Sequence, residues 1–154
     1  LGYSKMGGED IKKTMEWVQN QWDRNLTVKV RLRPNEQGMY LPRLRSQAFD
    51  VFRKGVGLDR PTCLAALEIF EPKHPENYLG LKDPTYAKAV QRLRAASEGN
   101  RKQRCSEAIK ILMDNYYFIP LGEMHFTLLA RPEFKGWDLN EINQLDLTDL
   151  RYSP

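Results

Sequence analysis

The first third of the chain combines helical and strand-like spacing of apolar residues. Four apolar residues recur at intervals of three or four, which is typical of a helix with one buried face: Ile11, Met15, Val18 and Trp22. We expect this helix to begin near Glu9 or Asp10, because acidic side chains stabilise a helix start. Residues 26–33 then alternate between apolar and polar, which predicts a half-buried strand ended by Pro34. Residues 1–4 read as the end of an earlier strand.

A second strand is predicted after a short connecting helix. Residues 36–46 favour a short helix, which Gly38 and Pro42 weaken. Residues 48–57 begin with aromatic and β-branched side chains that suit a strand. Two strands joined by a short helix are consistent with a parallel pair, so the sequence predicts an α/β fold.

The middle of the chain predicts three further helices. A short helix starts at Thr62 and ends before an irregular loop at residues 72–81. Asp83 followed by Pro84 is typical of an N-cap and a first helical position. We expect the helix that begins there to end at residues 99–100, where Gly and Asn follow each other. The next helix follows at once, which predicts an antiparallel helix pair.

The last part of the chain is less regular. Residues 123–130 alternate in polarity and predict a strand on which His125 faces outward. Residues 131–154 distribute leucines among Asp and Asn, a pattern too irregular for one long helix and too apolar for a disordered tail. These leucines require a surface to cover, and the preceding residues do not identify it.

The composition is that of an ordinary globular protein and argues against several functions. The 154 residues fit one domain, and 24 basic against 20 acidic residues give a net charge of +4. The basic residues are scattered, which indicates a solvated surface and no nucleic-acid site. Two distant histidines argue against a zinc site or a catalytic triad, and no acid–base pair or phosphate-binding glycine loop is present. We therefore expect no enzymatic activity, no metal and no cofactor.

The cysteines and the N-terminus allow more than one interpretation. Cys63 and Cys105 permit one disulfide without requiring it. Cys105 lies at helical spacing with apolar neighbours, which favours a small core residue over a reactive thiol. No apolar run reaches membrane-spanning length. The chain starts at Leu1 without an apolar leader, so we expect a fragment or a processed product.

The most unusual segment is residues 49–61. Gly55 and Gly57 flank Val56 in a run that otherwise suits a strand. Glycine costs stability there unless a ligand or another backbone approaches closely. A bend or a bulge would explain the same two glycines. Asp59 then adds one fixed negative charge near the end of the segment.

Ordered blocks along the chain resemble a known family. Residues 22–30 are similar to the family pattern W-x-x-N-L-G-V-x-V, and residues 49–55 are similar to F-D-(I/V)-x-R-x-G-W. Residues 78–86 resemble G-(Y/W)-x-N-P-x-Y-D. Later blocks follow in the same order at residues 111–112, 119–121 and 134–137. Together they resemble the C-terminal part of family 5 extracellular solute-binding proteins, the oligopeptide and dipeptide receptors of ABC importers.

This resemblance implies a type II periplasmic-binding-protein fold, in which two α/β lobes close on an extended ligand. Residues 1–117 would form an incomplete distal, second lobe with a small mixed sheet flanked by helices. Residues 118–154 would return to the first lobe, which is absent from this chain. We expect that tail to pack on its own lobe, to pack on a second copy of the chain, or to be poorly ordered.

The resemblance also implies binding roles near the end of the predicted strand. Gly55 and Gly57 match backbone positions that bond a peptide main chain as an added strand. Asp59 matches an aspartate that binds the α-amino group of the peptide. Val56 stands where the family has tryptophan, and this departure leaves the pocket shape, peptide length and ligand class open.

Arg53 matches an arginine that can bind the C-terminal carboxylate of a peptide, directly or through water. An ion pair between Arg53 and Asp50 or another neighbour would explain the residue equally well. The assignment of Arg53 to a ligand site therefore rests on the resemblance alone.

The leading functional hypothesis is a non-enzymatic binding component that delivers extended peptides to the permease of an ABC importer. Its implied partners are a peptide or other small ligand, the permease and the missing N-terminal lobe, with no nucleic acid. Its implied location is periplasmic or otherwise extracytoplasmic, with membrane contact only through a lipid anchor or the permease. The alternative is a receptor or scaffold with the same fold, another ligand or protein partner, and no role in peptide transport.

Overall fold

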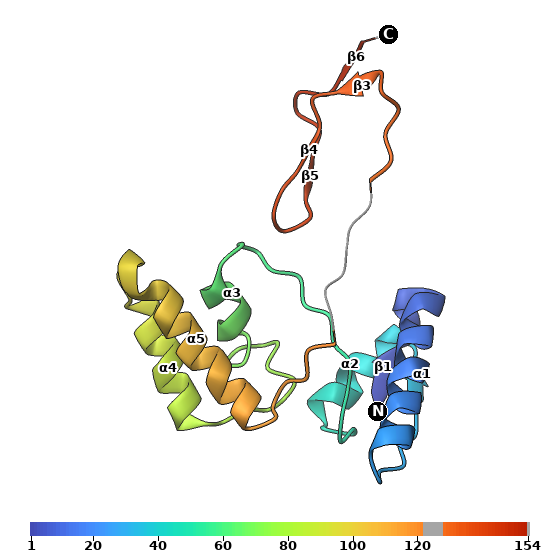
Figure 1. Cartoon of the computed structure of the whole chain (residues 1–154), viewed down its shortest axis with the longest axis vertical. Coiled ribbons are helices and arrows are strands. Elements are labelled where there is room, and N and C mark those ends of the chain that lie inside the picture. Colours follow the sequence, from blue (N-terminus) through green and yellow to red (C-terminus); the bar gives the residue numbers. More distant parts are fainter. Residues whose placement is uncertain (122–127, 154) are drawn as a thin grey trace. The chain divides into compact units, whose positions relative to one another are not determined.

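The computed structural model describes residues 1–121 and 128–153. The chain divides into two compact units, and Figure 1 labels their helices and strands. The first unit consists of Leu1–Val56 and Pro72–Lys82, and the second consists of Gly57–Glu71 and Asp83–Pro154. Each unit therefore combines segments that are distant in sequence.

A short parallel sheet lies at the centre of the first unit. β1 (Gly2–Ser4) pairs in parallel with β2 (Arg33–Asn35). The backbone of Gly2 also forms a parallel bridge with Phe52. The Gly2 N–H donates to the carbonyl of Val51, and the Arg53 N–H donates to the carbonyl of Gly2, both at 2.8 Å. Because bonding groups alternate along a strand, β1 lies between β2 and the segment around Phe52.

Helices cover this sheet with two apolar clusters. η1 (Lys5–Gly7) leads into α1 (Gly8–Asn25), whose predicted stripe is confirmed. Its buried side chains form one cluster with Tyr3 of β1: Ile11, Met15 and Val18. α2 (Gln37–Arg45) contributes Tyr40 and Leu44 to the second cluster. The predicted helix at residues 36–46 is therefore confirmed, although Pro42 lies within it.

The prediction of a strand at residues 26–33 is wrong. Residues 28–32 have no regular secondary structure, and the strand that forms, β2, begins only at Arg33. Helix α1 supplies the partners of the irregular segment: Gln19 Nε2 donates to the Val30 carbonyl at 2.6 Å, and Asp23 Oδ1 accepts from the Val30 N–H at 3.4 Å. Side chains thus satisfy backbone groups that the alternating pattern assigned to a neighbouring strand.

The strand predicted at residues 48–57 is much longer than the part that pairs in the structure. Only Phe52 pairs, in the bridge with Gly2, because β1 is three residues long and Gly2 is its residue next to this segment. Residues 53–58 have no regular secondary structure. The broader prediction of an α/β fold with small sheets flanked by helices is confirmed.

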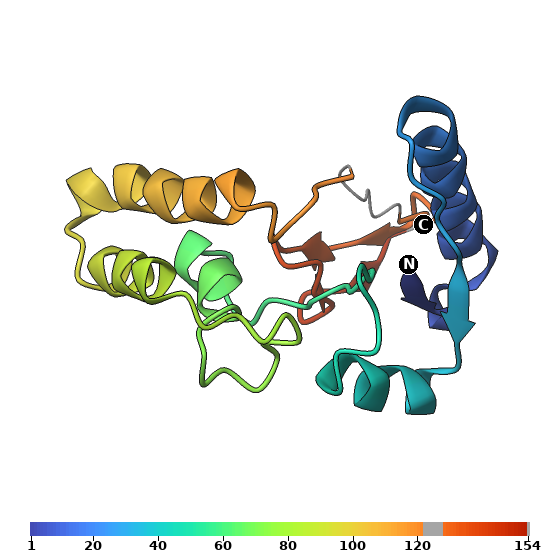
Figure 2. The same cartoon turned by 90° about the horizontal axis from the view of Figure 1, so that it is seen from below.

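Three helices form the main body of the second unit. They are α3 (Cys63–Glu68), α4 (Pro84–Arg94) and α5 (Glu98–Asp114). α4 and α5 lie side by side and run in opposite directions, which confirms the predicted pair (Figure 2). Asp83 is the predicted N-cap, and its Oδ1 accepts from the Thr85 and Tyr86 N–H groups at 2.7 and 3.3 Å. The fully buried Tyr86 then donates its hydroxyl to the Leu67 carbonyl at 2.6 Å, which ties α4 to α3.

The boundary between α4 and α5 differs from the expectation, and the cysteines have the state that the sequence left open. α4 ends at Arg94, and residues 99–100 lie in the first turn of α5. The N-cap of α5 is Ser97 and Glu98 places a negative charge in its first turn, so the helix starts before the glycine. Cys105 is half-buried on α5 and forms a disulfide with Cys63 of α3, with Cα atoms 6.2 Å apart. The two cysteines, whose state the sequence left open, therefore form a disulfide.

Residues 128–153 form two small antiparallel pairs. β3 (Phe134–Lys135) pairs with β6 (Arg151–Tyr152), and β4 (Asp138–Leu139) pairs with β5 (Leu145–Asp146). Gly136 is required between them, because its φ is +79° and an added Cβ would lie 2.0 Å from the Asp149 carbonyl oxygen. Apolar side chains of this tail line a groove of about 330 Å³, among them Leu129, Phe134, Trp137, Leu145, Leu147 and Leu150.

The predicted strand at residues 123–130 falls mainly outside the described residues, as does His125. Its last residues, 128–130, are not in a strand. Among the residues that the structure describes, no helix is long and apolar enough to cross a membrane.

Candidate ligand-binding segment

The five predicted site residues lie on one continuous segment that passes from the first unit to the second. Arg53, Gly55 and Val56 belong to the first unit, and Gly57 and Asp59 belong to the second. Exposed and half-buried residues alternate along the second half of this segment. Gly55, Gly57 and Asp59 are exposed, whereas the residues between them, at positions 56 and 58, are half-buried. The two glycines and the carboxylate of Asp59 are therefore all exposed.

Tyr40 anchors the beginning of the segment. Its side chain is 2% exposed, and its hydroxyl lies within hydrogen-bond distance of the Arg53 and Gly2 carbonyls, at 2.5 and 3.1 Å. Burial raises the pKa of Tyr40 to about 12, against an opposing effect of Arg53. The hydroxyl therefore keeps its proton at neutral pH. It can donate to the carbonyls of Arg53 and Gly2, where the segment pairs with β1.

Lys54 forms a hydrogen bond with a backbone group that the resemblance assigns to peptide binding, the carbonyl of Gly55. Its Nζ donates to the Gly55 carbonyl at 2.6 Å and lies 5.5 Å from the centre of the Tyr78 ring. The Arg45 guanidinium also lies 5.5 Å from the centre of that ring. A ligand that bonds the Gly55 carbonyl would have to displace an exposed ammonium group, which is a weak internal partner.

Neither glycine is needed by the conformation that the chain adopts. Both have φ values outside the positive region, so the backbone itself does not require glycine there. A Cβ at Gly57 would meet nothing within 4 Å, and one at Gly55 would meet the Arg53 guanidinium at an ordinary 3.7 Å. Neither residue forms a backbone–backbone hydrogen bond with another residue in the described ranges. A bend that depends on positive φ therefore does not explain them.

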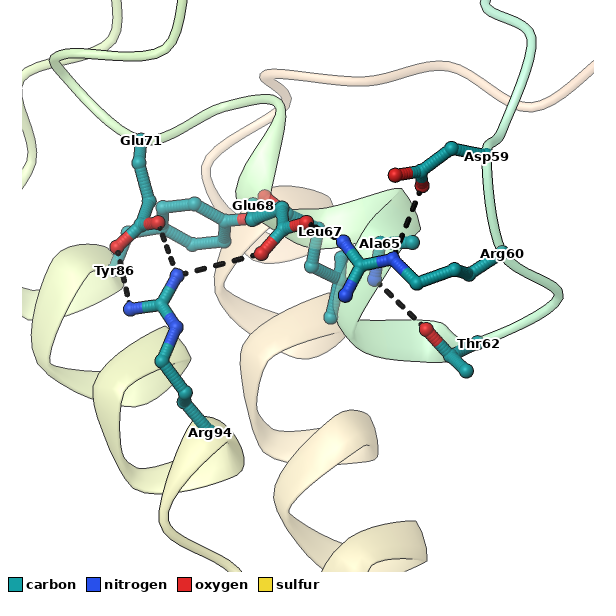
Figure 3. Close-up of polar contacts among 9 residues, drawn as sticks. All are labelled: Asp59, Arg60, Thr62, Ala65, Leu67, Glu68, Glu71, Tyr86 and Arg94. Carbon is teal, nitrogen blue, oxygen red and sulfur yellow. Dashed lines mark hydrogen bonds and ion pairs between the residues drawn. The ribbon is translucent and has the colours of Figure 1, made fainter.

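Asp59 stands at one end of a series of ion pairs (Figure 3). Its carboxylate is 75% exposed, and its Oδ1 accepts from Arg60 Nε at 3.2 Å. The Arg60 guanidinium also pairs with Glu68 of α3. Arg94 of α4 contacts the other oxygen of Glu68 at 3.5 Å and Glu71 at 2.6 Å. We call these five residues the charge series.

The two arginines of the charge series remain charged at any physiological pH. The hydrogen bond and charge of Asp59, followed by those of Glu68, raise the pKa of Arg60. The hydrogen bond that Arg94 donates to Glu71 is the largest cause that raises the pKa of Arg94. The acidic partners stabilise the charged guanidinium groups.

The end of the segment is fixed to α3. The Thr62 hydroxyl accepts from the Ala65 N–H at 3.2 Å and caps the helix. Cys63, the first residue of α3, is bonded to Cys105 of α5. Asp59 and Arg60 therefore lie on a short loop directly before a covalently fixed helix start.

The sequence did not predict the charge series. Arg94 lies 26 residues from Glu68 and 23 from Glu71, so no local spacing connects them. The one available signal was Arg60, which follows Asp59 directly and departs from the family pattern there. Arg53 does not pair with Asp50 among the described ion pairs, and the described residues contain no cluster that could hold a metal ion.

Comparison with known proteins finds similarity between this chain and peptide-binding proteins. No family model matches the chain. It is 27% identical over 135 residues to the periplasmic murein peptide-binding protein MppA of Escherichia coli, and this match spans 86% of the chain and 25% of MppA. The chain thus spans about a quarter of the length of this curated relative. The resemblance predicted from the ordered blocks is confirmed.

Solved structures show the same fold. The OppA protein of Haemophilus influenzae in complex with RPPGFSPFR matches with a TM-score of 0.79, at 23% identity, over 99% of this chain and 30% of that one. The pheromone receptor PrgZ, solved to show its mode of peptide binding, matches with a TM-score of 0.76, at 23% identity, over 100% of this chain and 30% of that one.

Proposed function

We propose that this chain is one part of the substrate-binding component of an ABC importer, which binds peptides in an extended form between two lobes and delivers them to the permease. The observation that carries the proposal is the similarity to the murein peptide-binding protein over most of the chain. In this proposal the protein is a non-enzymatic receptor. Residues 1–117 form much of one lobe, and residues 118–154 return to the other.

The candidate segment supports main-chain recognition of a peptide. Gly55 and Gly57 occupy exposed positions, and no side chain of the described residues requires them to be glycine. A bare backbone admits a second main chain at strand distance, and such bonds do not depend on the side chains of the ligand. Val56, where the family has tryptophan, would leave a wider pocket for the neighbouring side chain.

Asp59 is the proposed partner of the peptide α-amino group. Its carboxylate is 75% exposed, although one of its oxygens accepts from Arg60. An ammonium group that is removed from water by a closing lobe requires a charged acceptor, which a carboxylate provides. Arg53 is the proposed partner of a peptide carboxylate, because its half-buried guanidinium lies beside Gly55.

An extracytoplasmic location agrees with the disulfide. Disulfides persist in oxidising compartments such as the periplasm, and the described structure contains the Cys63–Cys105 bond. The relative MppA is periplasmic by name. We therefore propose a periplasmic or cell-surface location, with attachment through a lipid anchor or contact with the permease.

Calorimetry on the full-length protein that contains this chain tests the proposal. We expect it to bind members of a di- to pentapeptide mixture, and Asp59→Asn to weaken binding of a free-amine peptide by about tenfold or more. Asp50→Asn is the matched control, because it removes the same charge from an exposed residue nine positions earlier in the chain. Absence of binding to every peptide, or an affinity that Asp59→Asn leaves unchanged, would refute the peptide role.

A receptor or scaffold without peptide transport is the second candidate, and the replacement of the family tryptophan by Val56 favours it. Mass spectrometry of the protein purified under native conditions separates the two functions. Co-purified peptides would support the importer component and contradict the scaffold.

A further inference from the structure

The charge series contains more negative than positive groups. Its members are three carboxylates and two guanidinium groups, which alternate in sign from Asp59 to Glu71 (Figure 3). Both of its ends are carboxylates, and the end at Asp59 is the exposed one. The Asp59 carboxylate is 75% exposed, so a further positive group can reach it.

On this basis we propose that Arg60 is an internal competitor that lowers the affinity of the peptide site for a ligand amine: it occupies the Asp59 carboxylate without ligand, and a cationic amine on the ligand displaces it. The inference rests on the proposed function of Asp59. It adds a residue that tunes affinity at the amine end, and its effect is confined to peptides with an uncapped, protonated N-terminus.

The contact between Arg60 and Asp59 is the more exposed of the two that Arg60 makes. Arg60 Nε lies 3.2 Å from Asp59 Oδ1, and both side chains are more than half exposed, at 51% and 75%. At its other contact, Glu68 is only 20% exposed. Exposed ion pairs contribute little because water screens them. A ligand amine can therefore replace Arg60 at Asp59 at small cost.

Glu68 provides the place to which Arg60 withdraws. The guanidinium already contacts Glu68 Oε1, so it needs only to release Asp59. Arg94 holds Glu68 from the other side and is itself fixed by two contacts with Glu71. The position of Glu68 therefore does not depend on the ligand, and Arg60 stays paired in both states.

This exchange distinguishes ligands by the charge of their N-terminus. A free-amine peptide supplies the ammonium that replaces Arg60. An N-acetylated peptide has no cation to offer, so Arg60 remains on Asp59 and the acetyl group meets an occupied carboxylate. Removal of Arg60 should thus help the free-amine peptide and leave the acetylated peptide unaffected.

Calorimetry on the full-length protein, with one tripeptide in free-amine and N-acetylated forms, tests the inference. Arg60→Gln should tighten binding of the free-amine form by about two- to fivefold, as expected for loss of an exposed competing pair. It should leave the acetylated form unchanged, and Arg60→Lys should retain the original affinities because it keeps the cation. Arg101→Gln is the control for loss of an exposed positive charge elsewhere in the second unit.

A second variant should act in the opposite direction. Glu68→Gln removes the group to which Arg60 withdraws, so Arg60 holds Asp59 more firmly and the free-amine peptide should bind about two- to fivefold more weakly. In an Asp59→Asn background, Arg60→Gln should not change peptide affinity, because the carboxylate for which Arg60 and the ligand amine compete is absent.

The results separate this inference from the function on which it rests. If Asp59→Asn weakens the free-amine form selectively and Arg60→Gln does not tighten it, the competitor role is overturned while the peptide site stands. If Arg60→Gln and Glu68→Gln shift affinity in the same direction, the exchange is likewise overturned. If Asp59→Asn affects both forms equally, the amine role of Asp59 fails and the inference fails with it.

Discussion

The two ends of the candidate segment are held by different kinds of interaction. At Arg53 the backbone is bonded to β1 and to the buried hydroxyl of Tyr40. At Asp59 an exposed ion pair is the observed partner, and the fixed point is the disulfide at Cys63. The first end is therefore independent of salt and fixed by desolvated hydrogen bonds, whereas the second combines a covalent anchor with a readily exchanged charge. A rigid start and an exchangeable end are suited to a segment that must meet a ligand.

Removal of the disulfide should have the largest effect on stability. Replacing Cys63 and Cys105 by serine opens a loop with a sequence separation of 42 residues, which in the chain-entropy view costs about 4 kcal/mol in the free energy of unfolding. Denaturant titration of the full-length protein, with and without a thiol reductant, measures it. The reductant should not destabilise the serine variant further. Equal stability of the two proteins would show that the covalent anchor does not hold the second end.

Loss of the Tyr40 hydroxyl should come next. Tyr40→Phe removes the hydroxyl that lies near the Gly2 and Arg53 carbonyls. The Gly2 carbonyl keeps the Arg53 N–H as a donor, but the part-buried Arg53 carbonyl loses its donor, and we expect a loss of roughly 1–3 kcal/mol. Tyr116→Phe is the control, because Tyr116 is 86% exposed and should change stability by less than about 0.5 kcal/mol. Denaturant midpoints measure both. Equal losses would refute a buried anchor at the first end.

The raised pKa of the Tyr40 hydroxyl predicts that the free energy of unfolding depends on pH in the alkaline range. Tyr40 has its pKa raised to about 12 in the folded protein from 10.0, so the unfolded chain loses this proton first. The stabilisation is complete below pH 10 and declines as pH rises toward 12. The decline should be shallower in Tyr40→Phe, as measured by denaturant titration across this range. An identical slope in both proteins would contradict the burial of this hydroxyl.

The smallest effect is expected for the ion pairs of the second end. Arg94→Gln leaves Glu71 and Glu68 without their shared cation, and because Arg94 is half exposed we expect a loss of about 0.5–1 kcal/mol. This loss should shrink at high salt, whereas that of Tyr40→Phe should not. Thermal unfolding at two salt concentrations compares them. A loss that is insensitive to salt would remove the contrast between the two ends.

Features with local signals were predictable from the sequence, and features that depend on distant partners were not. The periodicity of Ile11, Met15 and Val18 and the cap at Asp83 specify their helices with neighbouring residues alone. The alternation at residues 26–33 could not reveal that Gln19 would bond the Val30 carbonyl. The pattern described a surface suited to a strand, but pairing requires a partner that the pattern does not contain.

The same distinction applies to the candidate site. Asp59 and the two glycines stand out in the sequence because of their unusual order, and the structure places all three at exposed positions. The charge series could not be predicted, since Arg94 reaches Glu68 and Glu71 only after α4 has folded against α3. The binding roles of Arg53, Gly55, Val56, Gly57 and Asp59 remain predictions.

Hydrogen exchange tests the central claim most directly, namely that residues 53–59 bond the main chain of a peptide. In the full-length protein without ligand, the exposed amides of Gly55 and Gly57 should exchange quickly, because neither makes a backbone bond within the described residues. On addition of a free-amine tripeptide, mass spectrometry of overlapping fragments should show these amides protected, while α1 is unchanged. Binding of the tripeptide with no added protection at residues 53–59 would contradict the account.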